Sequence, residues 1–237
     1  MNQKKFLAEV RKELKKYVDL EYRGAERRFF KEKIKNLGVR MPDRRKVAKK
    51  YFKKIKELEK KEVFEICERL LQGYGEEATV AFSWIYGIRE KYEKKDFKIF
   101  ERWVKKYVDN WGKCDDFCTH AVGYLVYSQP GLTEKLVAWT KSSNRWVRRA
   151  AAVSLIHPWG RKKKHLKVIF KIAEELLTDE DDMVQKGYGW MLKETSNHNQ
   201  QEVFRFVMKH KDRMPRTALR YAIEKMPKGL KKQAMAK

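Results

Sequence analysis

The stretch Asn144-Arg-Trp-Val-Arg-Arg-Ala150 recurs further along the chain as Asp181-Asp-Met-Val-Gln-Lys-Gly187. In both copies a polar residue that can cap a helix precedes an apolar pair and then a cation. Val147 returns as Val184 after 37 residues, close to the roughly 40 to 47 residues of helix-pair repeats. A third opening, Asn110-Trp111, lies 34 residues before Asn144. The repeat favours a solenoid of stacked helix pairs over a long helical bundle.

The rest of the chain carries the same helical pattern. Apolar residues recur at intervals of three and four, as in Phe64, Cys67, Leu70 and Leu71, whereas alternating strand patterns are hard to find. No Gly/Ser-rich linker divides the array. We therefore expect an all-α fold, a single HEAT-like helical-repeat domain over residues 1–237. All five prolines fall where helices are expected to begin or end: Pro42, Pro130, Pro158, Pro215 and Pro227.

The charge of the chain restricts its partners. Lys and Arg number 57 against 32 Asp and Glu, which leaves a net charge of +25. Such a field favours polyanions, and nucleic acid is the first candidate. No stretch reaches the roughly 18 apolar residues of a membrane span, and the first residues lack the apolar run of a signal peptide. We therefore expect a cytoplasmic protein that does not bind membranes, and we expect it to be a monomer.

Equivalent helices of a solenoid present the same face to one surface, so the exposed cations of successive repeats collect there. This brings Arg148, Arg149 and Lys186 together and predicts a concave basic groove suited to the DNA backbone. A further run of cations, Arg161-Lys-Lys-Lys164, lies between His157 and His165. We expect that run to contact phosphates or solvent rather than to take part in catalysis.

The most unusual segment is Asn110-Trp-Gly-Lys-Cys-Asp-Asp-Phe-Cys118, which sets a tryptophan and two carboxylates at the start of a helix in a very basic protein. Asp115 follows Trp111 by four residues and shares its helical face, whereas Asp116 lies about 140° away. One explanation is that these carboxylates only stabilise the helix N-terminus through the macrodipole. The other explanation is a chemical role. Phosphates repel a carboxylate that faces a DNA groove, so a carboxylate at that place needs a functional reason.

Trp190 is the second aromatic candidate. It follows Lys186 by four residues, which puts the two side chains on one helical face. Gly187 and Gly189 lie beside it, and their missing side chains would let another backbone approach closely or let two helices pack together.

Metal and nucleophile sites find little support in the sequence. Cys114 and Cys118 share a helical face, but His120 lies off it and no further cysteine is near. Three cysteines are too few for a disulfide framework, and no phosphate-loop, dinucleotide or GxSxG motif is present. We expect no metal and no cofactor.

Together these residues resemble the HEAT-repeat alkylpurine DNA glycosylases of the AlkD type. The similarity extends over most of the chain, and its segments follow one another in the family's order and spacing. The resemblance implies a solenoid of helix pairs with a basic groove for duplex DNA. The chain departs from the family at Phe29, where the family usually has Tyr, and at Gly112, where it has Asp. The segments that carry the similarity are Asn36-Leu-Gly-Val-Arg-Met-Pro-Asp-Arg-Arg45, Trp111–Asp115, Trp146–Ala151 and Gln185–Trp190.

The resemblance also implies a site and a reaction. It assigns the catalytic aspartate to Asp115, the paired active-site tryptophans to Trp111 and Trp190, a phosphate-binding arginine to Arg149 and the N-terminal aromatic position to Phe29. The implied substrate is double-stranded DNA that contains N3- or N7-alkylated purines, such as 3-methyladenine and 7-methylguanine. The N-glycosidic bond is cleaved while the base stays stacked in the duplex. Because no lysine nucleophile is identifiable, we expect a monofunctional glycosylase of base excision repair.

Two other functions stay open at this point. Helical-repeat proteins often serve only for binding, so a non-catalytic HEAT-repeat scaffold that binds DNA is the main alternative. A net charge of +25 equally suits binding to RNA. Release of a free base, and competition between alkylated duplex and structured RNA over a salt series, separate the three functions.

Overall fold

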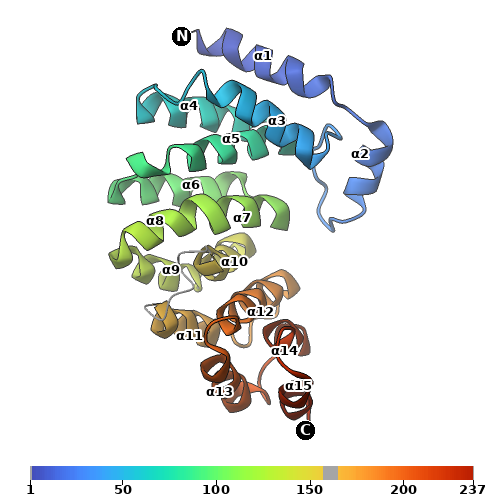
Figure 1. Ribbon diagram of the computed structural model, residues 1–237, viewed down its shortest axis with the longest axis vertical. Helices are drawn as coiled ribbons and strands as arrows, with labels where there is room; N and C mark the ends of the chain where they lie inside the picture. Colours follow the sequence, from blue (N-terminus) through green and yellow to red (C-terminus); the bar gives the residue numbers. More distant parts are fainter. Residues whose placement is uncertain (1, 157–164, 237) are drawn as a thin grey trace. The chain divides into compact units, whose positions relative to one another are not determined.

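The computed structural model describes residues 2–156 and 165–236 (Figure 1). The secondary structure of these residues is helical, and their only β-type contact is an isolated bridge between Val18 and Val39. The chain forms two compact units, of which the first ends at Phe117 and the second begins at Cys118. No helix in the described part of the chain is both long and apolar enough to cross a lipid bilayer.

The first unit is a stack of packed helices. Helices α3, α5 and α7 pack in succession, α4 packs on α5, and α1 packs on α3 and α4 (Figure 1). Large buried side chains such as Trp84, Trp103 and Phe117 fill the space between them. The helices of this unit are α1 (Gln3–Lys15), α2 (Leu20–Arg27), α3 (Met41–Phe52), α4 (Lys60–Leu71), α5 (Gly75–Gly87), α6 (Phe97–Tyr107) and α7 (Trp111–Phe117), with the short 3-10 turns η1 (Arg89–Lys91) and η2 (Lys94–Asp96) between α5 and α6.

The second unit shows two rows of helices. Helices α10, α12 and α14 pack in succession, while α9 and α11 pack on each other and on this row, and α13 packs on α12 and α14 (Figure 1). Its elements are the π-helical turn η3 (Cys118–Val122), α8 (Gly123–Ser128), the 3-10 turn η4 (Pro130–Leu132), α9 (Thr133–Trp139), α10 (Arg145–Val153), the 3-10 turn η5 (Ser154–Ile156), α11 (Leu166–Glu175), α12 (Asp182–Ser196), α13 (Gln200–His210), α14 (Arg216–Ile223) and α15 (Lys228–Met235).

The repeat seen in the sequence corresponds to two equivalent helices. The Asn144 side chain accepts a hydrogen bond from the Trp146 backbone N–H and starts α10, and Asp181 accepts from the backbone N–H groups of Met183 and Val184 and starts α12. These polar caps satisfy N–H groups that have no partner inside the helix. Because α10 and α12 pack side by side, the structure confirms the predicted all-α helical-repeat fold.

The prolines also mark helix boundaries as predicted, within the described residues. Pro42 lies in the first turn of α3, Pro130 opens η4, and Pro215 and Pro227 directly precede α14 and α15. A proline is tolerated there because the first N–H groups of a helix have no carbonyl partner inside the helix. Pro158 lies outside the described residues.

The two glycines of α12 have different neighbours. A Cβ at Gly189 would lie 2.9 Å from the carbonyl oxygen of Ala218, so the backbones of α12 and α14 approach closely at this point. A Cβ at Gly187 would lie 3.1 Å from Cγ of Arg149. Close backbone approach therefore explains Gly189, whereas the space beside Gly187 is filled by an arginine side chain of α10.

Candidate functional site

The start of α7 presents the tryptophan and the carboxylates that the sequence singled out. The Asn110 side chain accepts a hydrogen bond from the Lys113 backbone N–H at 3.0 Å and caps the helix. Trp111 is the first residue of α7 and is partly exposed, and Asp115 follows one helical turn later, also partly exposed. The structure therefore places both residues on the same short helix at the edge of the first unit's core.

The Trp111 ring stacks on Phe30, with ring centroids 4.9 Å apart and an interplanar angle of 16°. A Cβ at Gly112 would lie 3.4 Å from the Phe30 ring and 3.2 Å from the Asn110 side-chain oxygen. A larger residue at position 112 would therefore contact the Phe30 ring and crowd the Asn110 side chain that caps the helix. Gly112, where the chain departs from the family pattern, thus lies beside Phe30, the stacking partner of Trp111. The sequence did not reveal this stack.

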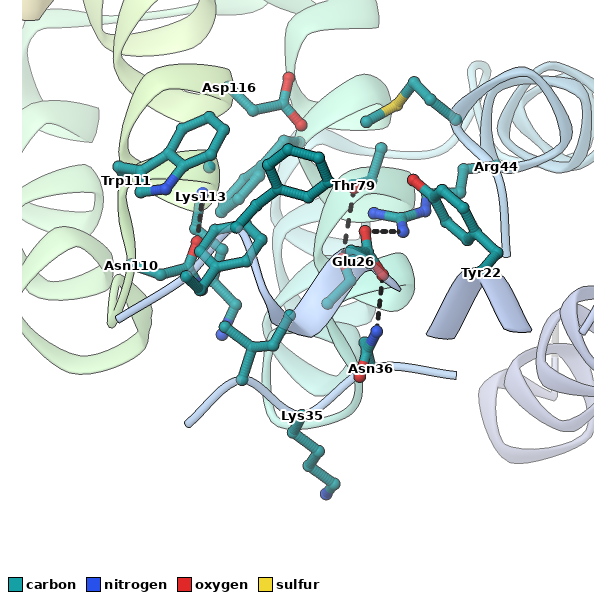
Figure 2. Close-up of a pocket in the computed structure, with 17 residues that line it drawn as sticks. Tyr22, Glu26, Lys35, Asn36, Arg44, Thr79, Asn110, Trp111, Lys113 and Asp116 are labelled. Atoms are coloured by element: carbon teal, nitrogen blue, oxygen red, sulfur yellow. Dashed lines mark hydrogen bonds and ion pairs between the residues drawn. The ribbon is translucent and has the colours of Figure 1, made fainter. Parts of the chain in front are cut away.

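A cavity of about 310 Å³ opens beside this stack (Figure 2). Its wall contains the aromatic side chains of α2, of the segment that follows α2, of α5 and of α7. Asp116, Lys113 and Arg44 add charged groups to the lining. The aromatic residues of the lining are Tyr22, Phe29, Phe30, Phe82 and Trp111.

The carboxylate that lines the cavity together with Trp111 is Asp116, whereas helical spacing favoured Asp115 as the carboxylate nearest the tryptophan. Gly112 and Asp116 lie one turn apart and both border the cavity, so this face of α7 is the one that meets it. Because Gly112 has no side chain, it leaves space for the cavity on this face of α7. The role of Asp115 in catalysis stays a prediction.

One wall of the cavity comes from α2 and the segment up to Asn36, and this wall carries little apolar packing. No residue of α2 is buried, and Phe29 is 77% exposed although it lines the cavity. Apart from the stack of Phe30 on Trp111, the wall is held by polar contacts. Glu26 pairs with Arg44 and accepts a hydrogen bond from the Asn36 amide at 2.6 Å.

Glu76 of α5 anchors the end of the same segment. Its fully buried carboxylate accepts hydrogen bonds from the backbone N–H groups of Leu37, Gly38 and Val39 at 2.9, 2.9 and 3.1 Å. Arg44 lies 3.5 Å from the same carboxylate and donates to the Val39 carbonyl oxygen. This network was missed by sequence analysis because its members lie far apart along the chain and follow no helical period.

In the second unit, the predicted DNA-binding arginines are engaged in internal contacts. Arg148 makes a two-pronged ion pair with Asp179 at 2.6 and 3.2 Å and also donates to the Ser142 carbonyl oxygen. Arg149 is 5% exposed and donates a hydrogen bond to the Met183 carbonyl oxygen at 2.5 Å. Both arginines therefore tie α10 to the start of α12, and their contact with phosphates stays a prediction.

The other two predicted residues of this unit lie on α12 and are more accessible. Lys186 is 3.2 Å from Asp182, and its side chain is 31% exposed. Trp190 is partly exposed, and its indole N–H donates to Glu194 at 3.3 Å. Lys225 also pairs with Glu194, at 3.0 Å, so the edge of the Trp190 ring is fixed by a small polar cluster.

The three cysteines behave as small apolar residues. Cys67, Cys114 and Cys118 are buried thiols that form no disulfide, and burial raises the pKa of the Cys67 thiol well above its usual range. Among the described residues, no group of three or more His, Cys, Asp or Glu side chains is arranged to hold a metal ion. His165 is buried, whereas His157 and Arg161-Lys-Lys-Lys164 lie outside the described residues.

Comparison with known proteins agrees with this fold. The family of DNA alkylation repair enzymes matches residues 10–226. A solved structure described as a predicted DNA alkylation repair enzyme from Enterococcus faecalis is similar, with a TM-score of 0.80 and 19% sequence identity over 89% of this chain and 97% of that chain. No curated protein matches the chain. Since the family match extends over most of its length, the chain belongs to the family of DNA alkylation repair enzymes.

Proposed function

We propose that this protein is a DNA glycosylase that hydrolyses the N-glycosidic bond of N3- or N7-alkylated purines in duplex DNA. Membership of the family makes it a DNA repair enzyme. The observation that carries the finer assignment is the start of α7, where Asp115 follows Trp111 by one turn in a protein of net charge +25. A carboxylate near DNA phosphates is unfavourable unless it faces a cation, and the proposed substrate supplies one.

Alkylation at N3 or N7 gives the purine a formal positive charge and weakens its bond to the sugar. As the base departs, positive charge develops on the sugar in an oxocarbenium-like transition state. Asp115 stabilises this charge and orients the attacking water, while Trp111 offers an electron-rich ring face to the cationic nucleotide. The ring contributes roughly 0.5 to 2 kcal/mol. No covalent intermediate with a lysine is involved, so the product is an abasic site in an uncut strand.

In this proposal the second unit also binds the DNA. Lys186 contacts a phosphate, and Trp190 contributes its ring face to recognition of the nucleotide. Arg148 holds the start of α12 in position, since its ion pair with Asp179 already takes up its guanidinium. Arg149 keeps the phosphate role that the family resemblance implies. The base remains stacked in the duplex while the bond is cut, as the resemblance also implies.

Incubation of the protein with methylated duplex DNA tests the reaction. We expect free 3-methyladenine and 7-methylguanine, detected by chromatography, and strand breaks only after alkaline treatment of the abasic sites. Asp115→Asn removes the charge with little change in shape. We expect it to lower the rate of base release by about 100- to 1,000-fold, the usual cost of losing one preorganised electrostatic group.

The matched control is Asp212→Asn, because Asp212 is exposed in the second unit and has no role in the proposal. Both variants should keep the helical circular dichroism spectrum and the DNA affinity of the unchanged protein. Unchanged base release by Asp115→Asn would refute the role of Asp115. Tight DNA binding without any base release would instead establish a non-catalytic DNA-binding scaffold, and preference for structured RNA in a salt series would establish RNA binding.

A further inference from the structure

The cavity beside Trp111 has no role in a reaction that leaves the base stacked in the duplex. Its volume of about 310 Å³ is at the lower end of the roughly 300 to 1,000 Å³ that small-molecule sites occupy. A site of this size holds one purine base with part of its sugar, and it is too small for a stretch of nucleic acid or peptide.

The walls of the cavity suit a flat ring. Phe30 and Trp111 are already stacked almost parallel, and Tyr22 lies across the cavity from Trp111 (Figure 2). Phe29, the most exposed large apolar side chain among the described residues, stands at the opening. Stacked and edge-on aromatic contacts bind planar heterocycles, and an electron-rich ring face favours a positively charged one.

The charged groups of the lining also favour a cation. The Lys113 ammonium is 2.8 Å from Asp109 and donates to the Tyr107 carbonyl oxygen. The Lys35 side chain points away from the cavity and covers the Tyr74 ring instead (Figure 2).

Arg44 is the third cation of the lining, and it is matched by nearby acceptors. It pairs with Glu26 and Glu76 and donates to the Val39 carbonyl oxygen. Lys113 and Arg44 are therefore paired with carboxylates, and Asp116 adds a carboxylate on the same side as Trp111.

The wall of the cavity that α2 supplies is fixed by polar side chains. α2 contributes no buried residue, and its contacts to α3 and to the following segment are polar: Glu26 with Arg44, and Arg27 with Asn36. The side chains of Glu26 and Arg44 are only 13% and 8% exposed, so this ion pair fixes the wall and keeps the cavity formed.

We propose that this cavity binds a single N-alkylated purine as a cation, between the aromatic wall and Asp116. The inference rests on the proposed function, because that function is what brings alkylated purines to the protein. The same chemistry can come from two sources: a base that has been released from DNA, or a damaged base that swings out of the duplex. The experiment has an arm for each.

The first arm measures binding of nucleosides by isothermal titration calorimetry at about pH 6, where aspartates are ionised and a methylated guanine ring keeps its charge. We expect 7-methylguanosine to bind about tenfold more tightly than guanosine, which has nearly the same shape without the charge. Asp116→Asn should reduce this preference to within about twofold. Thr79→Leu, which adds volume inside the lining, should weaken binding of 7-methylguanosine by about tenfold, and Asp212→Asn should change nothing.

The second arm uses a duplex that contains 2′-fluoro-7-methyldeoxyguanosine, whose glycosidic bond resists hydrolysis, with 2-aminopurine as the adjacent base. Increased 2-aminopurine fluorescence on protein binding, lost in Thr79→Leu, identifies the source as a base swung out of the duplex, and it would refute the part of the proposed function in which the base stays stacked. Unchanged fluorescence together with nucleoside binding identifies it as a released base. Either result supports the cavity as a site for purine cations.

Equal binding of guanosine and 7-methylguanosine would overturn the inference, and so would an Asp116→Asn variant that keeps the preference. The proposed function has a separate test, since Asp115→Asn should lose base release and still bind 7-methylguanosine. Base release without nucleoside binding would refute the purine site in the cavity and would still support the proposed glycosylase function. Nucleoside binding without base release from methylated DNA would refute the proposed glycosylase function.

Discussion

The close approach of α12 and α14 at Gly189 allows a sharp test of the packing that positions Trp190. In Gly189→Ala, the new Cβ would lie 2.7 Å from Cβ of Tyr221, 2.9 Å from the carbonyl oxygen of Ala218 and 3.2 Å from its Cα. These atoms belong to, or are bonded directly to, the backbone of α14, so none of them can rotate away. The two helices must separate by some tenths of an ångström.

The expected cost follows from two opposing terms. Overpacking of a well-packed contact destabilises a protein by about 1 to 3 kcal/mol. Replacing glycine with alanine inside a helix returns at most about 1 kcal/mol through helix propensity. Because two of these contacts are shorter than 3.0 Å, the overpacking cost lies in the upper part of that range, at about 2 to 3 kcal/mol. We therefore expect Gly189→Ala to lower the free energy of unfolding by about 1 to 2 kcal/mol. For a chain of this size, that corresponds to a decrease in Tm of about 2 to 8 °C.

Thermal unfolding followed by circular dichroism and by calorimetry measures this decrease. The control is Gly24→Ala in α2, because a Cβ there would meet no atom within 4 Å. That variant should leave Tm unchanged or raise it slightly. A Gly189→Ala protein as stable as the unchanged one would refute the close approach of the two helices. DNA affinity measured on the same variant then reports how far Trp190 depends on this packing.

Two further predictions concern buried or paired carboxylates of the first unit. Glu76→Gln should lower the free energy of unfolding by about 3 to 5 kcal/mol. The amide cannot replace a buried carboxylate that accepts hydrogen bonds from three backbone N–H groups and faces Arg44. Denaturant titration measures the free energy of unfolding, and a loss below about 1 kcal/mol would contradict this prediction. Hydrogen bonds from Lys16 and Lys50 lower the pKa of Glu13 to about 2. The contribution of the ionised Glu13 side chain to the stability of the fold is therefore complete above its unfolded pKa of about 4.5 and is lost as the pH falls toward 2. The difference in free energy of unfolding between the unchanged protein and Glu13→Gln should vanish over that interval. A difference that does not depend on pH would count against the pairing of Glu13 with Lys16 and Lys50.

Sequence patterns predicted the fold well because its determinants are local and periodic. The capping residues Asn144 and Asp181 precede helices that pack side by side, as the 37-residue repeat indicated. A proline in the first turn of α3, and prolines directly before α14 and α15, likewise predicted where these helices begin. Each of these signals depends on a few neighbouring residues, and helix geometry translates such signals directly into structure.

The site was harder to predict because its contacts link distant residues. Periodicity placed Trp111 and Asp115 on one helix correctly, but it could not show that Phe30 stacks on Trp111 or that Asp116 borders the cavity. Arg149 was expected at a phosphate, and its burial depends on the space that Gly187 leaves on another helix. Such contacts form only when packing brings distant helices together, and no periodic pattern in a single sequence indicates them.

The absence of buried side chains in α2 has a consequence for how this protein can change over generations. Most substitutions that alter a binding site also reduce the stability of the fold, and they are lost when stability falls below the level that function needs. Substitutions in α2 at positions other than Glu26 largely escape this limit, because no residue of the helix is buried. Residues such as Tyr22 and the neighbouring Phe29 can therefore be exchanged without loss of the folded unit. Selection can therefore change the shape of the cavity at these positions with little effect on the fold.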